Sequence, residues 1–210
     1  MTLASDGRTS RAEAQRTARR QEILDAAVRV FSEHGYHTAS VSDVIDAAGI
    51  SRGTFYLYFD GKEPLFLELL ERFILRIRDA VRVVDPDGAN PTAELLENVG
   101  RVVDVVFDNR DLAVVVFRQS MGVNPEVDAK LLRLYGFLQE MVEGALINGA
   151  ASGLTREVNA PIVATALIGA MKEIFYRYLV IEPVARPDRT AVAHTLLDFG
   201  LRGLLLSSDA

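Results

Sequence analysis

Apolar residues recur three and four places apart through almost the whole chain, and this spacing constrains the fold more than any other feature. The period matches one face of an α-helix, whereas a half-buried strand alternates apolar and polar residues. The sequence therefore predicts an all-α protein. The expected helices lie at 17–34, 41–48, 51–59, 62–84, 91–107, 112–117, 125–150, 161–181 and 191–206.

Several of these helices carry recognisable end signals. Gly35 and Gly49 suit C-caps, because glycine adopts the left-handed backbone that ends many helices. Ser40 followed three places later by Asp43 predicts a capped helix start, and Ser51 predicts another. The segment DPDGANP is the clearest break in the helical pattern.

Two β-branched runs leave an alternative open. VVDVVF at 102–107 and LAVVVF at 112–117 flank DNRD, and β-propensity alone would permit a hairpin there. Neither run alternates apolar with polar residues, and Asn-Arg is poor chemistry for a hairpin turn. We therefore favour helices for both runs.

Composition excludes several classes of protein. No run approaches about 18 consecutive apolar residues, and the first residues lack the apolar core of a signal peptide, so we expect a cytoplasmic protein without a membrane segment. The chain has no cysteine, and its histidines, His34, His37 and His194, form no cluster. A glycine-rich phosphate loop and a nucleophile elbow are also missing. We expect no metal, no cofactor and no enzymatic activity.

The most unusual stretch is GISRGTFYLYFDGKE, which holds four aromatic rings in five positions. Helical geometry turns Phe55 and Phe59 toward one side, with Tyr58 near them. The outward side then holds Gly53, Thr54, Tyr56 and Leu57. A glycine in an exposed helix costs about 1 kcal/mol relative to alanine, so a partner is expected to approach this side closely.

A short helix, a tight turn and a second short helix anchored by Phe55 have the spacing of a helix-turn-helix, whose second helix enters a DNA major groove. Arg52 is a candidate donor to guanine, and Leu57 a candidate contact for a thymine methyl group. Gly53 would let the helix backbone approach the DNA closely. Donors to phosphate are expected at Ser51, Thr54, Tyr56, Tyr58 and Lys62.

Charge is unevenly distributed along the chain. The net charge is −6, but residues 1–62 hold equal numbers of basic and acidic side chains, so the later residues carry the whole excess. Five arginines and one glutamate lie between positions 8 and 20. A basic N-terminal arm at 1–16 is a candidate for a DNA minor-groove contact, and a solvated basic tail is the alternative.

The segment 23–66, ILDAAVRVFSEHGYHTASVSDVIDAAGISRGTFYLYFDGKEPLF, resembles the N-terminal domain of tetracycline-repressor-type (TetR/AcrR) transcriptional regulators. The match includes the turn at Gly35 and the exit pattern YxYF…KE. The chain departs from the family pattern at Ile45, where alanine is common, and at Gly61, where serine is common.

This resemblance implies a homodimeric repressor that binds a palindromic double-stranded DNA operator and is released by a small-molecule effector. It implies a DNA-binding domain at 17–62 and a larger helical domain at 63–210 for effector binding and dimerisation. The family's DNA contacts would fall on Thr38, Ser51, Arg52, Gly53, Thr54, Tyr56, Tyr58 and Lys62. A helical protein-interaction module with an exposed tyrosine-rich surface, and without DNA binding, is the alternative; steep weakening by salt would favour DNA.

The larger domain offers candidates for a pocket and a dimer interface. The pocket candidates are large apolar residues and one cation: Phe107, Phe117, Arg118, Tyr135, Met141, Met171 and Phe175. Asn148 and Lys172 could orient a polar group. The dimer candidates combine small and apolar residues at helical spacing on the last two helices, which suits a four-helix seam: Ala166, Leu167, Gly169, Ala170, Leu196, Leu197, Gly200, Leu201, Gly203 and Leu204.

Overall fold

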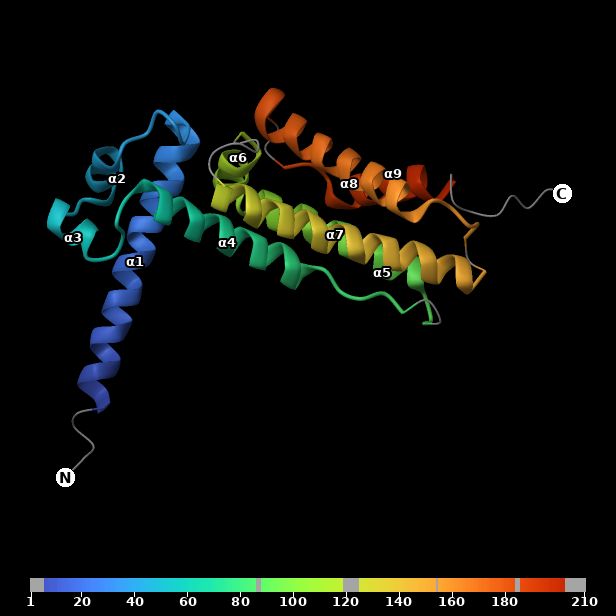
Figure 1. The fold of residues 1–210 in the computed structure, drawn as a ribbon, viewed down its shortest axis with the longest axis horizontal. Helices are drawn as coiled ribbons and strands as arrows, with labels where there is room; N and C mark the ends of the chain where they lie inside the picture. The colour runs from blue at the N-terminus through green and yellow to red at the C-terminus, as the bar shows by residue number, and fades with distance from the viewer. Residues whose placement is uncertain (1–5, 86–87, 119–124, 154, 184–185, 203–210) are drawn as a thin grey trace. The chain divides into compact units, whose positions relative to one another are not determined.

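The computed structural model describes residues 6–85, 88–118, 125–153, 155–183 and 186–202, and side chains within these ranges from residue 11 to residue 200. All regular structure in these ranges is helical, which confirms the predicted fold class (Figure 1). The elements are α1 (Asp6–His34), α2 (Val41–Ala48), α3 (Arg52–Tyr56), α4 (Lys62–Ala80), α5 (Pro91–Asp108), α6 (Arg110–Arg118), α7 (Pro125–Ala151), α8 (Ala160–Tyr176), the π-helical turn η1 (Arg177–Ile181) and α9 (Arg189–Arg202).

The chain divides into two compact units, Met1–Glu71 and Arg72–Ala210. We call these the N-terminal unit and the C-terminal unit. The division falls inside α4, whereas the sequence analysis placed the domain boundary between 62 and 63. Helix α4 therefore contributes residues to both units.

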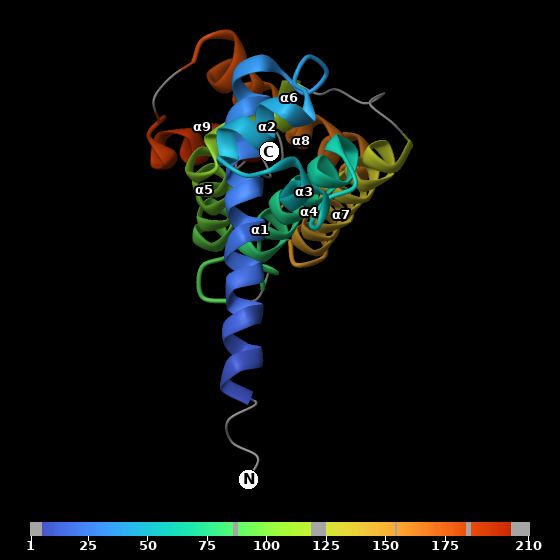
Figure 2. The same cartoon turned by 90° about the vertical axis from the view of Figure 1, so that its left-hand side faces the viewer.

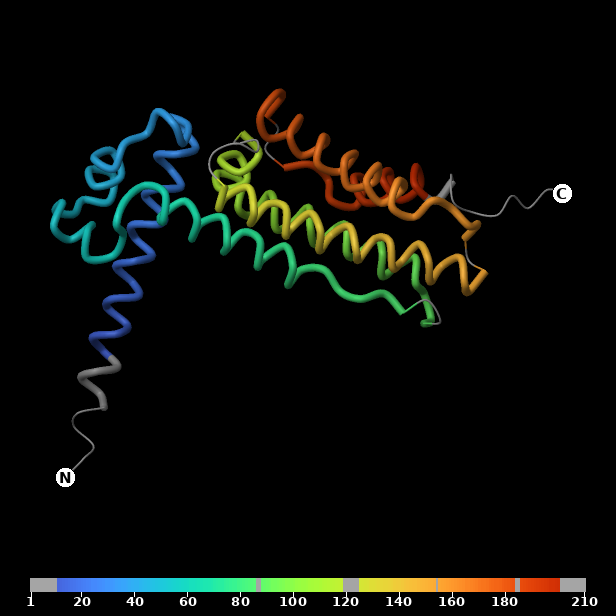
Figure 3. Tube along the Cα trace, viewed as in Figure 1, coloured from blue at the N-terminus to red at the C-terminus, as the bar shows by residue number. Residues whose placement is uncertain are grey.

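In the N-terminal unit, α1, α2, α3 and the first half of α4 surround an aromatic core. The ring of Phe31 meets Tyr36 edge-on at 5.5 Å between centroids and Phe66 at 6.4 Å. Phe55 is fully buried. Figure 3 follows the chain through α1 and then through the short helices α2 and α3.

The predicted caps are present in this unit. Ser40 and Asp43 form a reciprocal capping box at the start of α2, with Ser40 N donating to Asp43 Oδ2 at 2.7 Å. The hydrogen bonds from the Ser40 backbone and side chain lower the pKa of Asp43. Gly49 ends α2 with φ of 62°, a left-handed conformation that glycine adopts without strain.

In the C-terminal unit, α5 packs along α9 and α7 packs along α8, while α6 contacts η1 (Figures 1 and 2). The β-branched runs at 102–107 and 112–117 lie in α5 and α6, so the preference for helices over a hairpin is confirmed. The predicted helix 161–181 consists of α8 followed by the π-turn η1.

Among the described residues, the predicted helix ends that differ most from the structure are the start of α1 and the end of α4. Helix α1 begins at Asp6, so it includes most of the segment assigned to a basic arm at 1–16. Helix α4 ends at Ala80 rather than at Val84. Beyond Ala80 the chain is rich in β-branched valine, and side chains of α5 bind its backbone: Arg101 Nε donates to Ala80 O at 2.7 Å, and Asn98 bonds both polar backbone groups of Arg82.

Candidate DNA-binding surface and ligand pocket

Helix α3 separates its anchors from an outward surface as predicted. Phe55 is 0% exposed and Phe59 is 3% exposed, whereas Tyr56 is 48% exposed and Leu57 is 74% exposed. Gly53 and Arg52 are also exposed. The two buried phenylalanines anchor this short helix to the core. The exposed leucine and tyrosine on its other side form a surface that a binding partner could contact.

Ser51 fixes the start of α3. Its Oγ accepts from Thr54 N at 3.0 Å and lies 2.9 Å from Thr54 Oγ1. Arg52 reaches back to α2, where its Nη2 donates to Ser42 Oγ at 3.2 Å. A guanidinium carries five donors, so this single exposed bond leaves Arg52 able to donate elsewhere.

Lys62 has a different environment from the one the sequence analysis expected. Its Nζ donates to three backbone carbonyls of the α1–α2 turn, those of Tyr36 at 2.7 Å, Ala39 at 2.8 Å and His37 at 3.2 Å. The ammonium also lies 4.7 Å from the Tyr36 ring centroid. An ammonium has three donors, so Lys62 is engaged within the protein, where it braces the turn that carries exposed Thr38.

Arg20 is a residue whose role the sequence analysis missed. Its Nε donates to both carboxylate oxygens of Glu68, at 3.1 and 3.0 Å, and its Nη1 donates to Tyr58 O at 3.0 Å. The guanidinium lies 4.3 Å from the Phe59 ring centroid. Arg20 thus connects α1, the exit of α3 and α4. Arg20 lies four places before Leu24, so it shares the buried face of α1. This spacing could have indicated that Arg20 contacts the rest of the unit.

The C-terminal unit contains an apolar pocket of about 680 Å³, lined from α4, α5, α6, α7 and α8 and from the segment after α4. Five predicted residues line it: Phe117, Tyr135, Met141, Met171 and Phe175. The volume lies within the range of about 300–1,000 Å³ that is typical of small-molecule sites.

Two of the predicted pocket residues lie outside the lining. Phe107 is buried behind it, with its ring 6.3 Å from that of Phe175, because it lies on a different face of α5 from the lining residues. Arg118 is exposed at the last position of α6. Phe107 therefore supports a wall of the pocket, and Arg118 is not among the residues that line it.

The contribution of α4 was not predicted, and on α5 the predicted residue was Phe107 rather than the face that lines the pocket. Phe73 and Ile77 of α4 line the pocket, and so does one face of α5, formed by Leu95, Val99, Val102 and Val106. The spacing of the α5 residues is helical and was visible in the sequence. That this face meets a cavity depends on how the helices pack.

Polar groups are few along the pocket wall. Burial raises the pKa of Tyr135, and the Lys172 ammonium lies 5.8 Å from the Tyr135 ring centroid. Asn98, Asn148 and Arg82 also contribute to the lining. This pattern, an apolar wall with a few polar groups, is typical of a site that binds an apolar ligand and fixes its orientation.

The predicted dimer residues divide into several groups. Gly200 faces Leu167 within the chain, since a Cβ at Gly200 would lie 3.1 Å from Leu167 Cδ2. Ala166 and Gly169 are exposed on α8 and Ala170 is partly buried, as are Leu196 and Leu197 on α9. Two large side chains that were not predicted, Ile162 and Phe199, are 66% and 74% exposed. The side chain of Leu201 and all of Gly203 and Leu204 lie outside the described residues.

Among the residues that the structure describes, no helix is long and apolar enough to cross a membrane. No group of three or more histidine, aspartate or glutamate side chains in the same ranges is arranged to hold a metal ion.

Comparison with known proteins agrees with this arrangement. Residues 23–69 match the family model described as bacterial regulatory proteins of the tetR family, and residues 88–204 match the tetracyclin repressor-like C-terminal domain. The fatty acid metabolism regulator protein of Bacillus subtilis (strain 168) is 25% identical over 195 residues, which cover 90% of this chain and 97% of that protein.

Two solved structures extend the similarity. FadR from Bacillus halodurans, a fatty acid degradation regulator, has a TM-score of 0.69 and 27% identity, covering 88% of this chain and 95% of that chain. FadR from Bacillus subtilis, solved in complex with stearoyl-CoA, has a TM-score of 0.67 and 26% identity, covering 87% and 98%. These matches favour DNA binding over the protein-interaction alternative. Because the C-terminal model alone covers more than half of the sequence, the chain belongs to the TetR family of DNA-binding transcriptional regulators and is not an enzyme.

Proposed function

We propose that this regulator is a repressor whose DNA binding is released by a long-chain acyl thioester of coenzyme A. The observation that carries the proposal is the apolar pocket of about 680 Å³ in the C-terminal unit. Its wall is mostly aliphatic and aromatic, which suits a hydrocarbon chain. The stearoyl-CoA in the structure of Bacillus subtilis FadR supports this choice of ligand class.

The proposed DNA contacts lie on the outward side of α3 and next to it. Arg52 and Leu57 read base edges, while Gly53 allows close approach of the backbone. Hydroxyl donors contact phosphates: Thr38, Ser51, Thr54, Tyr56 and Tyr58. Lys62 acts by bracing the turn that holds Thr38, in place of the direct phosphate contact expected from the sequence. We assign the DNA-binding role to residues 17–62 and the effector role to 63–210.

The regulator is proposed to act as a homodimer in the cytoplasm, where it binds a palindromic operator. Ala166 and Gly169 permit close approach of a second copy to α8, and exposed Ile162 and Phe199 supply apolar area. Two recognition helices that read successive major grooves lie about 34–36 Å apart. Sedimentation at micromolar concentration is expected to return a dimer, and a monomer alone would contradict this arrangement.

Helix α4 is proposed to carry the switch, because Phe73 and Ile77 line the pocket and the same helix begins at Lys62 in the N-terminal unit. A ligand that shifts α4 by a small amount disturbs both half-sites of a dimer together. Allosteric coupling of about 1–3 kcal/mol changes operator affinity about five- to 150-fold.

The test uses an operator selected from random-sequence DNA and fluorescence anisotropy. Palmitoyl-CoA is expected to weaken operator binding, whereas coenzyme A alone is expected to have no effect. Linkage requires that palmitoyl-CoA bind the operator-bound protein more weakly than the free protein by the same factor. Equal affinity for the two forms would exclude palmitoyl-CoA as the effector.

A further inference from the structure

A second hollow adjoins the apolar pocket and has a different chemical character. It measures about 570 Å³ and lies between the segment after α4 and the first turns of α5. Arg82, Val83 and Asn98 line both hollows, so the two are neighbours. The side chains that line only the second hollow include Asn90, Glu94, Glu97 and Arg101. The apolar pocket therefore adjoins a polar hollow, which we call the recess.

Arg82 lies at the junction with its backbone fixed and its guanidinium available. Asn98 Oδ1 accepts from Arg82 N at 2.9 Å, and Asn98 Nδ2 donates to Arg82 O at 2.8 Å. The exposed Arg82 side chain has no hydrogen bond or ion pair with any residue that the structure describes. Arg101, in contrast, is engaged with Ala80 O and Asn98. Arg82 therefore offers donors to a ligand.

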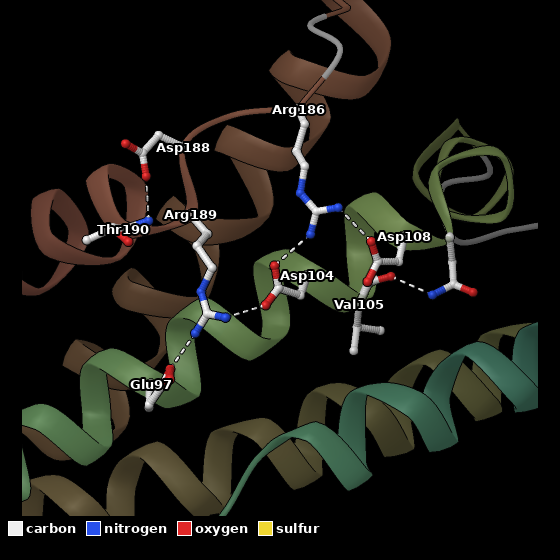
Figure 4. Close-up of polar contacts among 9 residues, drawn as sticks. Glu97, Asp104, Val105, Asp108, Arg186, Asp188, Arg189 and Thr190 are labelled. Atoms are coloured by element: carbon white, nitrogen blue, oxygen red, sulfur yellow. Dashed lines mark hydrogen bonds and ion pairs between the residues drawn. The ribbon is translucent and has the colours of Figure 1, made fainter.

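The acidic side chains of the recess already have partners. Glu97 pairs with Arg189 of α9, which also binds Asp104 at 2.6 Å, as Figure 4 shows. Gly100 leaves room for this arginine, since a Cβ there would lie 2.6 Å from Arg189 Nη2. Glu94 Oε2 accepts from Asp85 N at 3.4 Å. The recess thus holds two arginines, Arg82 and Arg101, and two carboxylates, Glu94 and Glu97, and Glu97 is paired with Arg189 of α9 and not with Arg82.

We propose that this recess binds the phosphate-bearing head group of the acyl thioester, with Arg82 as the residue that recognises its negative charge and the acyl chain in the adjoining pocket. The inference rests on the proposed function. Arginine matches the fork geometry of phosphate oxygens, and these hydrogen bonds are charge-assisted. The recess is in the size range of a complete ligand site, about 300–1,000 Å³, so it has room for much more than a carboxylate.

Both hollows share Asn98, which bonds both polar backbone groups of Arg82. The bound head group would meet Arg82, which Asn98 holds against α5, two residues after α4 ends at Ala80. A ligand that occupies both hollows therefore contacts the end of α4 and the wall of α5 at once. A fatty acid without the head group would occupy only the apolar side.

The test compares palmitoyl-CoA with palmitate by equilibrium binding to the full chain. Arg82→Gln is expected to raise the Kd for palmitoyl-CoA at least about tenfold, the lower end of the effect of removing one charge-assisted hydrogen bond. The Kd for palmitate is expected to stay unchanged. Arg82→Lys should restore part of the affinity, and Arg133→Gln, an exposed arginine of α7 outside both hollows, should change neither Kd.

Unchanged affinity of Arg82→Gln for palmitoyl-CoA would overturn the inference and leave the proposed effector intact. Equal weakening of palmitoyl-CoA and palmitate would also overturn it, because Arg82, which lines the apolar pocket as well, would then not act through the phosphate-bearing head group. If the unaltered protein bound neither ligand, the proposed effector and the recess assignment would both be wrong. Thermal unfolding of each variant checks that the exposed substitution leaves the fold intact.

Discussion

The cationic side chains that connect the helices of the two units have different main acceptors, although Arg101 of the C-terminal unit also donates to a backbone carbonyl. In the N-terminal unit, Lys62 donates to three backbone carbonyls, and Arg20 binds a backbone carbonyl as well as Glu68. In the C-terminal unit, Arg186 and Arg189 bind three carboxylates of α5: Glu97, Asp104 and Asp108 (Figure 4). Bonds to carbonyls fix backbone geometry, whereas exposed ion pairs depend on salt.

This difference suits the work proposed for each unit. A recognition surface must hold α3 and the α1–α2 turn in one arrangement, so rigid contacts to the backbone are appropriate there. A unit that responds to a ligand has to shift between arrangements, and ion pairs that are at least partly exposed can break and re-form at low cost. Four predictions test this comparison.

The largest effect is expected from Phe55→Ala. Phe55 is fully buried in the N-terminal core, and removal of such a ring costs about 3–5 kcal/mol. Hydrogen exchange should show loss of protection in residues 11–71 and retained protection in the C-terminal unit. DNA binding should be lost while palmitoyl-CoA still binds.

The matched control is Leu57→Ala, two residues away on the exposed side of the same segment. It should change the free energy of unfolding by no more than about 0.5 kcal/mol and still alter DNA binding. If Phe55→Ala abolished protection in both units together, the two units would not be energetically separate.

The next effect is expected from Lys62→Met, which removes the donor to three carbonyls but keeps an apolar stem of similar length. Carbonyls left without a donor cost about 1–3 kcal/mol. Denaturant unfolding should show this loss at both low and high salt, because the acceptors are neutral. A loss that disappeared at high salt would indicate that Lys62 acts through general charge attraction.

Sequence reasoning succeeded where the signal is local. Ser40, Asp43 and Gly49 set the ends of α2 through contacts within a few residues, and the pattern of Phe55 and Phe59 identified the buried side of α3. The contact from Arg20 to Glu68 spans 48 positions, and no local pattern specifies it. For the same reason the helical spacing of apolar residues in the sequence indicated an apolar face on α5 but did not indicate that this face lines a cavity.

The C-terminal ion pairs should contribute less, and a double-mutant cycle can isolate them. Arg189→Gln is expected to cost below about 1 kcal/mol, with the loss shrinking as salt rises, since the side chain is partly exposed. Gly100→Ala in that background should gain about 1 kcal/mol from helix propensity. In the presence of Arg189 the gain should be smaller, because the new Cβ displaces the guanidinium.

Measured unfolding free energies of the two single variants and the double variant give the coupling energy. Full additivity would mean that Gly100 has no role in seating Arg189. A cost of Arg189→Gln as large as that of Lys62→Met, and equally independent of salt, would remove the difference proposed between the two units.

The smallest effect concerns pH, and each unit contributes one tyrosine. Burial, with a contribution from Glu63, raises the pKa of Tyr36, and burial raises the pKa of Tyr135. In both cases folding favours the neutral phenol, so the associated stability is present below the ordinary tyrosine pKa of about 10 and is lost as pH rises through the folded-state value.

Spectrophotometric titration of the variants tests this assignment. Each of the substitutions Tyr36→Phe and Tyr135→Phe should remove one late-ionising group from the titration curve. Near Tyr135, which lines the pocket, saturating palmitoyl-CoA excludes water and should delay ionisation further, whereas Tyr36 should titrate as before. If the ligand shifted both tyrosines equally, the pocket and the α1–α2 turn would be coupled more tightly than the contrast between rigid and adjustable contacts allows.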